Sequence, residues 1–452
     1  MKAPELLLPA GSLEHMRYAF AFGADAVYAG QPRYSLRVRN NDFHKLAIME
    51  QGIREAHAAG KQFFVASNLM PHNAKIKTYM ADMEHVIAMQ PDALIMADPG
   101  LIMMVRERWP EMPIHLSVQA NTVNYQAVRF WQSLGLTRVI LSRELSLDEI
   151  EEIRQQCPDI ELEVFVHGAL CIAYSGRCLL SGYFNHRDPN QGTCTNACRW
   201  DYKTHASDQQ DDAPQKIDFD ALSAMQSQSF SDCGQQQRHP LADKIYLIEE
   251  ANRPGELMPI FEDEHGTYIM NSKDLRAVQH IERLTRMGVD CLKIEGRTKS
   301  IYYVARTAQI YRKAIDDALA GRSFDPTLIS QLDNLANRGY TDGFFQRHPT
   351  QEQQNYLHGY SSQLRQQFVG EVVAYDADNQ RLEIDVRNQF SVGDTLEMIC
   401  PEGNISFSAT QLFNQQGQAI ERAAGSGHRV SLPWQQPWQG PGLLARALNA
   451  ET

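Results

Sequence analysis

Long hydrophobic runs are missing from this sequence of 452 residues. No stretch reaches the roughly 20 apolar residues that a membrane helix needs. The apolar run near the start is interrupted at Pro9 and Gly11, which makes it too short for a secretory signal peptide. We therefore expect a cytoplasmic protein, in which clustered cysteines more often bind metal or carry out redox chemistry than form disulfides.

An excess of positive charge is also missing, since the formal net charge is −12. Proteins that grip nucleic-acid backbones over a wide surface usually carry a basic face. The charge argues against such a uniform coat but is compatible with a local basic patch. Composition alone favours a small-molecule substrate, so any nucleic-acid function must be argued from other features.

Several catalytic motifs are absent as well. There is no glycine-rich phosphate loop, which argues against a dinucleotide-binding Rossmann domain. Neither a serine nucleophile elbow nor an HExxH helix occurs, which argues against a serine hydrolase and a zinc peptidase of the common type.

Short β-type runs alternate with helical periodicity through the first three hundred residues, a pattern typical of βαβ units and a parallel sheet. We predict helices at His15 to Phe22, Phe43 to Ala59, Leu147 to Gln156 and Leu275 to Met287. The predicted strands are Glu5 to Leu8, Ala24 to Tyr28, Gln62 to Ala66, Ala93 to Ala97, Ile114 to Val118, Arg138 to Leu141, Glu161 to Val166 and Cys291 to Glu295. Eight strands are the number that closes a (β/α) barrel, and polar residues repeatedly follow the strands, so we prefer a TIM-barrel-like α/β domain to an open doubly wound sheet.

The chain divides into two predicted domains. The barrel-like domain covers residues 1–345 and ends with helices at Tyr302 to Leu319 and Pro326 to Asn337. Within it, residues 203–242 are rich in Gln, Ser and Asp and are expected to form a flexible surface insertion. Residues 346–366 form a linker. Residues 367–452 carry short alternating strands, which predict a small all-β barrel or sandwich.

Four of the eight cysteines gather in one segment, at Cys171, Cys178, Cys194 and Cys198. Four thiolates suit either a tetrahedral zinc ion or an iron-sulfur cluster, and the spacing alone does not decide between them. Isolated cysteines behave as small hydrophobes, so Cys157, Cys291 and Cys400 are predicted to be buried structural thiols.

The residues around the first two of these cysteines resemble a known family. The stretch EVFVHGALC from Glu163 to Cys171, followed by GRCLLS, resembles the signature of the collagenase-like, formally unassigned peptidase family. The resemblance continues through DAVYAGQPRYSLRVRNNDF, MADPGLIM, HLSVQANTVN, GTYIMNSKDLRA and LKIEGRTKS, and covers most of residues 1–345 and, more weakly, the tail. Within the family, the chain most resembles the branch of prephenate-dependent tRNA uridine hydroxylases, which make 5-hydroxyuridine at the wobble position.

The resemblance implies a 4Fe-4S cluster held by Cys171, Cys178, Cys194 and Cys198, with Cys233 as an alternative fourth ligand. It further implies prephenate as a co-substrate and the tRNA anticodon loop as the partner. Two other functions stay open: a metallopeptidase of the collagenase-like type, and a noncatalytic iron-sulfur component of a hydroxylase complex.

Three side chains are candidate catalytic groups: Glu163, His167 and Glu295. His167 ends a predicted strand four residues before Cys171, and its ordinary pKa near neutrality would let it exchange protons. By strand parity, Glu163 is expected on the same face as His167. The alternative is that His167 only supports the cysteine loop through a hydrogen bond.

Polar residues that follow the predicted strands form a second group of candidates. Arginine can grip a carboxylate with two parallel hydrogen bonds, so Arg143 and Arg297 are predicted to bind prephenate, together with Gln119 and Asn121. The alternative is that these arginines form ion pairs with Glu144 or Glu295 that fix the loops.

A third group could bind RNA. Arg33, Tyr34, Arg37 and Arg39 combine positive charge with an aromatic ring and could hold phosphates and stack on an exposed base, with Lys299 on the same face of the barrel. The alternative is a solvated loop that stabilises the barrel rim.

Overall fold

The computed structural model describes residues 2–36, 41–170, 273–296, 299–335, 337, 339–346 and 366–448, together with the backbone of six strands between 202 and 267. Predicted features in the other ranges lie outside the described residues. These include all four clustered cysteines, Cys233, Arg37, Arg39 and Arg297.

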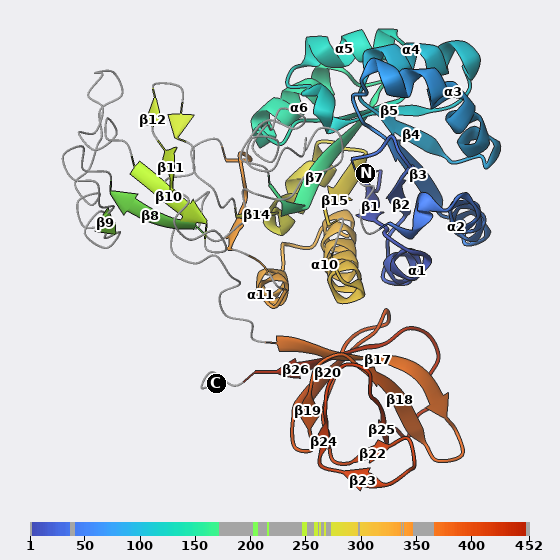
Figure 1. Cartoon of the computed structure of the whole chain (residues 1–452), viewed down its shortest axis with the longest axis vertical. Helices are drawn as coiled ribbons and strands as arrows, with labels where there is room; N and C mark the ends of the chain where they lie inside the picture. The colour runs from blue at the N-terminus through green and yellow to red at the C-terminus, as the bar shows by residue number, and fades with distance from the viewer. Residues whose placement is uncertain are drawn as a thin grey trace.

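Eight parallel strands form a closed barrel, as predicted (Figure 1). Each strand pairs with the next along the chain, and the last pairs with both the first and the seventh, which closes the ring. The strands are β1 (Glu5–Pro9), β2 (Ala26–Gly30), β3 (Gln62–Ser67), β4 (Ala93–Met96), β5 (Ile114–Leu116), β6 (Arg138–Ile140), β7 (Glu161–Ala169) and β15 (Cys291–Ile294). Nearly all their residues are buried, because helices cover the outside and side chains fill the inside.

Helices surround this barrel. They are α1 (Leu13–Ala21), α2 (Leu46–Ala58), α3 (Asn73–Ala88), α4 (Pro99–Arg108), α5 (Tyr125–Ser133), α6 (Leu147–Gln156), α9 (Ile281–Arg286), α10 (Ile301–Leu319) and α11 (Thr327–Asp333). Local sequence fixes several starts: Ser146 and Glu149 form a reciprocal capping box at α6, and Ser300 caps α10. These caps explain why the predicted starts of α6 and α10 agree with the structure to within one residue.

The predicted helix from Leu275 to Met287 is wrong in its first half. Residues Asp274–Arg276 form strand β14, and α9 begins only at Ile281. Strand β7 runs past the barrel, and β14 pairs antiparallel with its last residues, His167 to Ala169. The unpaired end of β7 thus overrides the helical periodicity of the segment. The short strand β16 (Tyr340–Thr341) pairs parallel with β14 and extends this edge.

Part of the predicted insertion 203–242 has regular structure. Strands β8 (Tyr202–Ala206), β9 (Gln215–Lys216), β10 (Tyr246–Glu250) and β11 (Leu257–Ile260) form a four-stranded antiparallel sheet, beside the small pair β12 (Glu262–Asp263) and β13 (Gly266–Thr267). Two of these strands, β8 and β9, fall at least partly within the range that we expected to be irregular.

The C-terminal segment is an antiparallel all-β domain, as predicted. Its main sheet has eight strands, and β19 (Phe390–Ser391) pairs separately with β24 (Arg422–Ala423). The main-sheet strands are β17 (Gln366–Asp376), β18 (Arg381–Val386), β20 (Thr395–Ile399), β21 (Ile405–Ser408), β22 (Leu412–Asn414), β23 (Ala419–Ile420), β25 (Arg429–Pro433) and β26 (Leu443–Ala447). They enclose a hydrophobic core of their own.

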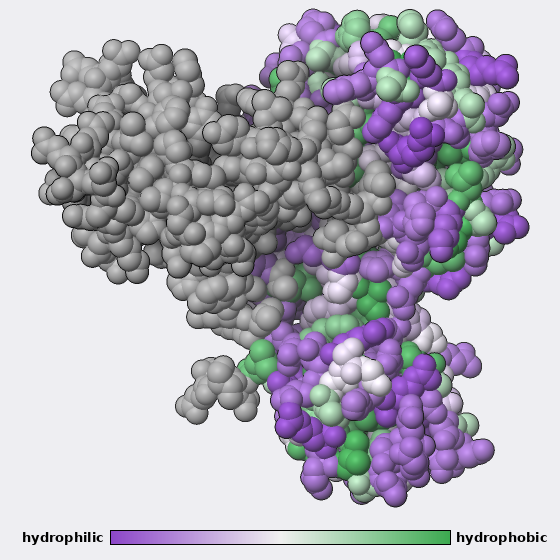
Figure 2. Space-filling model, in the orientation of Figure 1, coloured by the Kyte–Doolittle hydropathy of each residue, from purple (hydrophilic) through white to green (hydrophobic). Residues whose placement is uncertain are grey.

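The β domain packs against α10 and α1 of the barrel (Figure 1). The rings of Tyr302 and Phe368 stack with centroids 5.1 Å apart, and Gln309 donates to the backbone oxygen of Cys400. Figure 2 shows that the coloured surface of both parts is mostly hydrophilic, with small scattered hydrophobic spots. Among the described helices, none combines the length and the apolar character required to cross a bilayer.

Candidate active site at the barrel mouth

Arg143 and Glu295 meet at the carboxyl end of the barrel. Arg143 follows β6 and Glu295 follows β15, and the Arg143 Nη2 lies 3.4 Å from the Glu295 Oε2. The guanidinium also contacts the ring of Phe165, with its Cζ 3.7 Å from the ring centroid. Both charged side chains are largely covered, with exposed fractions of 11% and 17%. The structure thus brings together two predicted site residues, in the ion pair that we weighed as the alternative to substrate binding.

Gln119 and Asn121 occupy the neighbouring part of the mouth. The Gln119 Oε1 accepts hydrogen bonds from the Asn68 Nδ2 at 3.2 Å and from the Ser117 hydroxyl. This arrangement fixes the amide group of Gln119. Asn121 has a left-handed backbone, and its side chain donates to the Gln119 backbone oxygen, so it shapes the turn after β5.

Two hydroxyl groups lie buried beside these residues. The Ser142 backbone N–H donates to the Thr122 backbone oxygen at 3.2 Å, so the two residues are neighbours. Their side-chain oxygens have no hydrogen-bond partner among the described residues. Buried polar groups without partners are rare in proteins, and a bound ligand or a covering segment would satisfy them.

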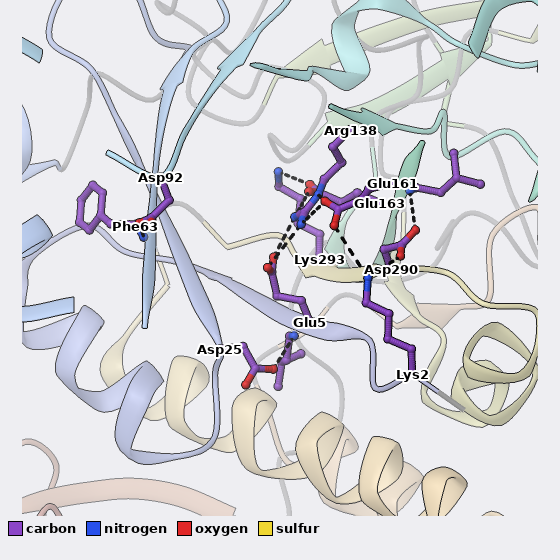
Figure 3. A network of polar contacts seen from close by, with 12 residues as sticks. Lys2, Glu5, Asp25, Phe63, Asp92, Arg138, Glu161, Glu163, Asp290 and Lys293 are labelled. Carbon is purple, nitrogen blue, oxygen red and sulfur yellow. Dashed lines mark hydrogen bonds and ion pairs between the residues drawn. The ribbon is translucent and has the colours of Figure 1, made fainter. Parts of the chain in front are cut away.

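Glu163 does not reach the mouth, which corrects its predicted catalytic role. It is completely buried inside the barrel. Its Oε1 lies 2.6 Å from the Lys293 Nζ, and its Oε2 lies 3.3 Å from the Arg138 Nη1 (Figure 3). Arg138 also contacts Glu5 at 2.8 Å. Glu163 therefore belongs to an internal ion-pair network and cannot touch a substrate in this structure.

His167 lies away from Glu163, so the prediction from strand parity is wrong. The pairing of β7 with β15 shifts register between Lys293 and Ile294, and Val166 is the extra residue. Such a bulge reverses the alternation of side chains along a strand. As a result His167 lies among the rings of Tyr303, Tyr311 and Tyr340, with centroids 5.4 to 5.7 Å away.

The protonation state of His167 follows from its neighbours. Burial, reinforced by the positive charges of Lys299 and Arg276, lowers the pKa of His167 to about 3. The ring is therefore neutral at neutral pH: it can accept a hydrogen bond, but it is too weak a base to be protonated there and has no imidazolium proton to give.

The tautomer of His167 follows from one hydroxyl group. The Tyr311 hydroxyl donates its single proton to the Val166 backbone oxygen at 2.8 Å. It must then accept from the His167 Nδ1, 3.2 Å away, which places the ring proton on Nδ1. The Nε2 is left as a buried acceptor with no partner among the described residues.

The predicted RNA-binding residues that the structure describes contact other residues of the protein. The Arg33 guanidinium pairs with Asp82 at 2.8 Å, as the structural alternative requires. Tyr34 is fully buried and its hydroxyl donates to the same carboxylate, so the prediction that its ring stacks on a base is wrong for this conformation. Lys299 lies 5.0 Å from the Tyr303 ring centroid and 3.9 Å from Asp274.

The cysteine segment begins where the described part of β7 ends. Leu170 is the last described residue before Cys171, and β7 reaches the carboxyl end of the barrel. Cys157, Cys291 and Cys400 are buried free thiols, as predicted. Among the described residues, no group of three or more His, Cys, Asp or Glu side chains could hold a metal ion.

Sequence reasoning missed four polar residues that the structure places in or below the mouth: Asn68, Ser117, Arg138 and Lys293. The last two carried a usable signal. Arg138 starts a strand, and Lys293 interrupts the apolar run CLKIEG, and a charge within a buried strand requires a buried partner. Asn68 and Ser117 follow their strands directly but stand among other polar residues, so nothing singled them out.

The chain matches two family descriptions that together span most of its length. Residues 11–355 match peptidase family U32, and residues 364–446 match the C-terminal domain of the same family. The chain belongs to peptidase family U32. This agrees with the resemblance read from the segment between Glu163 and Ser181.

U32 relatives with a functional name cover this chain almost completely. "tRNA hydroxylation protein P" of Escherichia coli (strain K12) is 59% identical over 453 residues, which is 100% of this chain and 98% of the relative. The protein of the same name from Haemophilus influenzae is also 59% identical, over 95% of this chain and 93% of its own length. "Collagenase" of Porphyromonas gingivalis is 25% identical over 95% of this chain and 94% of its own.

A solved structure described as the U32 peptidase Mk0906 matches 66% of this chain and 94% of its own, with 10% identity and a TM-score of 0.37.

Proposed function

We propose that this U32 protein is a cytoplasmic enzyme that hydroxylates a tRNA uridine, using prephenate as a co-substrate to make 5-hydroxyuridine at the wobble position. The observation that carries the proposal is the 59% identity, over the whole chain, to a protein named for tRNA hydroxylation. The closed barrel fits an enzyme, because barrel enzymes build their sites from the residues that follow the strands. Here those residues include Arg143, Glu295, Gln119 and Asn68.

The proposed cofactor is a 4Fe-4S cluster held by Cys171, Cys178, Cys194 and Cys198, with Cys233 as the alternative fourth ligand. Four cysteine thiolates are the donor set that such clusters use. The segment follows Leu170 in the sequence, and Leu170 comes directly after β7. When bound, the cluster would supply one-electron redox chemistry.

The cofactor proposal has a direct test. Anaerobically purified protein should be brown and contain iron and acid-labile sulfide, whereas a zinc protein would be colourless. Colourless protein that contains zinc and no iron would overturn the cluster proposal.

The residues of the mouth would bind and orient the co-substrate. Prephenate is a dicarboxylate, and we assign one of its carboxylates to the Arg143 guanidinium, which lies on the Phe165 ring at the mouth. Glu295 would hold the guanidinium in place. Arg297, Gln119 and Asn121 remain proposed binding residues. Glu295 remains the proposed proton-handling group, and the role proposed for the neutral His167 ring is that of a hydrogen-bond acceptor.

The RNA would be held mainly by the barrel rim. Residues 366–448 contain five arginines, no lysine and nine acidic residues, so the β domain offers little to a phosphate backbone. Arg33, Arg37, Arg39 and Lys299 remain proposed contacts to the anticodon loop. Of these, Arg33 would have to exchange its pairing with Asp82 for a phosphate.

A metallopeptidase is the second candidate, because the family carries that name and one relative is named a collagenase. Within the described residues no metal-binding group supports it. A noncatalytic iron-sulfur component of a hydroxylase complex is the third candidate.

Nucleoside analysis of tRNA separates these candidates. A strain that lacks the gene, in a background without another hydroxylation pathway, should lose 5-hydroxyuridine derivatives at the wobble position. Persistence of these nucleosides would overturn the proposed function. Hydroxylation of tRNA by the purified protein and prephenate would exclude the noncatalytic role.

A further inference from the structure

A continuous series of contacts, which we call the column, runs through the barrel to Arg143. It consists of ion pairs followed by contacts between cations and aromatic rings. At its lower end, Glu5 contacts Arg138, which contacts Glu163, which contacts Lys293 (Figure 3). Arg138 and Lys293 are only 5% and 3% exposed, so their positive charges depend on these carboxylates.

The column continues upward through aromatic rings. The Lys293 Nζ lies 4.4 Å from the ring centroid of Tyr28 and 5.4 Å from that of Phe165. The Cζ of the Arg143 guanidinium lies 3.7 Å from the same Phe165 ring centroid. The Phe165 ring thus contacts both a buried ammonium group and a guanidinium group, and contacts of both cations with the ring are favourable.

The backbone of β7 explains why Glu163 and Phe165 work together. They are two residues apart on the same strand, so both point into the barrel. The bulge at Val166 follows immediately and turns His167 outward. The strand therefore contributes the anion that holds Lys293 and the ring that supports Arg143.

We propose that Glu163 and Lys293 are positioning residues. They hold the Phe165 ring in place, and this ring supports the Arg143 guanidinium so that the N–H groups of Arg143 can bind a substrate carboxylate. The proposal rests on the proposed function for the identity of that carboxylate, the dicarboxylate prephenate. Without the Glu163 charge, Lys293 would be an uncompensated cation under the ring, and water or a shift of Lys293 would have to relieve it.

Steady-state kinetics of tRNA hydroxylation tests this. Glu163→Gln keeps the shape but removes the charge, and should raise KM for prephenate about tenfold with kcat changed less than about twofold. Lys293→Met, which removes the cation instead, should do the same. Phe165→Leu removes the ring that supports Arg143. The double variant E163Q/F165L should raise KM no further than F165L alone, because both substitutions act through the contact between Phe165 and Arg143.

Glu5→Gln is the matched control. Glu5 belongs to the same network but contacts Arg138 and lies at the far end from Phe165. This variant should lower thermal stability while KM for prephenate stays unchanged. If E163Q behaves like E5Q, with lower stability and an unchanged KM, the positioning role is wrong.

A second measurement does not require activity. In protein labelled with ¹⁵N-arginine, the side-chain signal of Arg143, assigned by its loss in Arg143→Lys, should report slow rotation of a fixed guanidinium. In E163Q this signal should shift and broaden, and an unchanged signal would overturn the proposal. Absence of any hydroxylation by the unaltered protein would instead count against the proposed function, and the Arg143 signal would still decide the positioning role.

Discussion

Gly168 lies where β7 passes the end of β15, and the structure leaves no room for a side chain there. Its φ is +103°, and a Cβ atom would come within 2.3 Å of the Glu295 backbone oxygen. The close approach sets the position of Glu295 relative to the start of the cysteine segment. Gly168 is thus a structural requirement for the mouth.

We predict that Gly168→Ala destabilises the protein by about 3 kcal/mol or more, from backbone strain and the clash together. Chemical denaturation measures this. Gly60→Ala is the control, because Gly60 also has a positive φ, +66°, but has nothing within 4 Å of the added carbon, and should cost about 1 kcal/mol. Equal costs for both variants would show that the contact with Glu295 has no energetic weight.

His167 gives a prediction about pH. Its pKa of about 3 in the folded protein lies below the ordinary value of 6.5, so below about pH 6.5 the unfolded chain binds a proton that the folded protein does not. Stability from this group is complete above pH 6.5 and falls by about 1.4 kcal/mol per pH unit as the pH decreases towards 3. In His167→Gln that slope should be smaller.

The measurement is the free energy of unfolding as a function of pH for both proteins. His85→Gln, on the exposed side of α3, is the control and should leave the slope unchanged. A curve for His167→Gln that stays parallel to that of the unaltered protein would show that His167 is not held neutral by its surroundings.

Among the elements, β7 shows what sequence could and could not predict. The eight strands were predictable because buried parallel strands are short apolar runs between amphipathic helices. That Arg143 and Glu295 share one rim was predictable too, since the carboxyl ends of parallel strands lie at one end of a barrel. The bulge at Val166 was not, because it depends on pairing with β15, and it separated Glu163 from His167.

The same reasoning explains the other errors. The apolar residues around Leu275 are spaced as in a helix, but Leu275 belongs to strand β14, which pairs with the end of β7. Tyr34 looked like a stacking ring, yet it packs edge-on against Tyr79 with ring centroids 4.9 Å apart. Both outcomes depend on residues distant in sequence, which local patterns do not report.

Helix α10 of the barrel packs against the β domain, and Arg306 forms an ion pair across this contact. This side chain is 1% exposed, and its Nη2 lies 3.4 Å from the Glu397 Oε2 of the β domain. Removal of one partner from a buried ion pair typically costs about 3 kcal/mol. We predict that Arg306→Ala loosens the β domain, so that calorimetry shows two unfolding transitions where the unaltered protein shows one.

Arg312→Ala is the matched control on the same helix. Arg312 pairs with Asp25 and Asp316 within the barrel domain and is 21% exposed. It should cost less than about 1 kcal/mol and leave a single transition. If Arg306→Ala also unfolds in one transition with a similar small cost, the contact with Glu397 does not couple the domains.

The molecule as a whole is a closed barrel of peptidase family U32 with a β domain, and its cysteine segment follows β7 in the sequence. A charged column supports the mouth from below, and the β domain packs on the helical side at α10 and α1. The described mouth residues Arg143 and Glu295 follow β6 and β15, and the cysteine segment follows β7 in the sequence. The chemistry that we propose requires the cysteines to act beside these mouth residues.

The most direct test is complementation of the deletion strain with single cysteine variants, read out as 5-hydroxyuridine derivatives in purified tRNA. We predict that the unaltered gene and Cys157→Ala, which alters a buried structural thiol, restore the modification, whereas Cys171→Ala does not, at equal protein levels. Full restoration by Cys171→Ala would contradict the claim that this cysteine segment carries out tRNA hydroxylation.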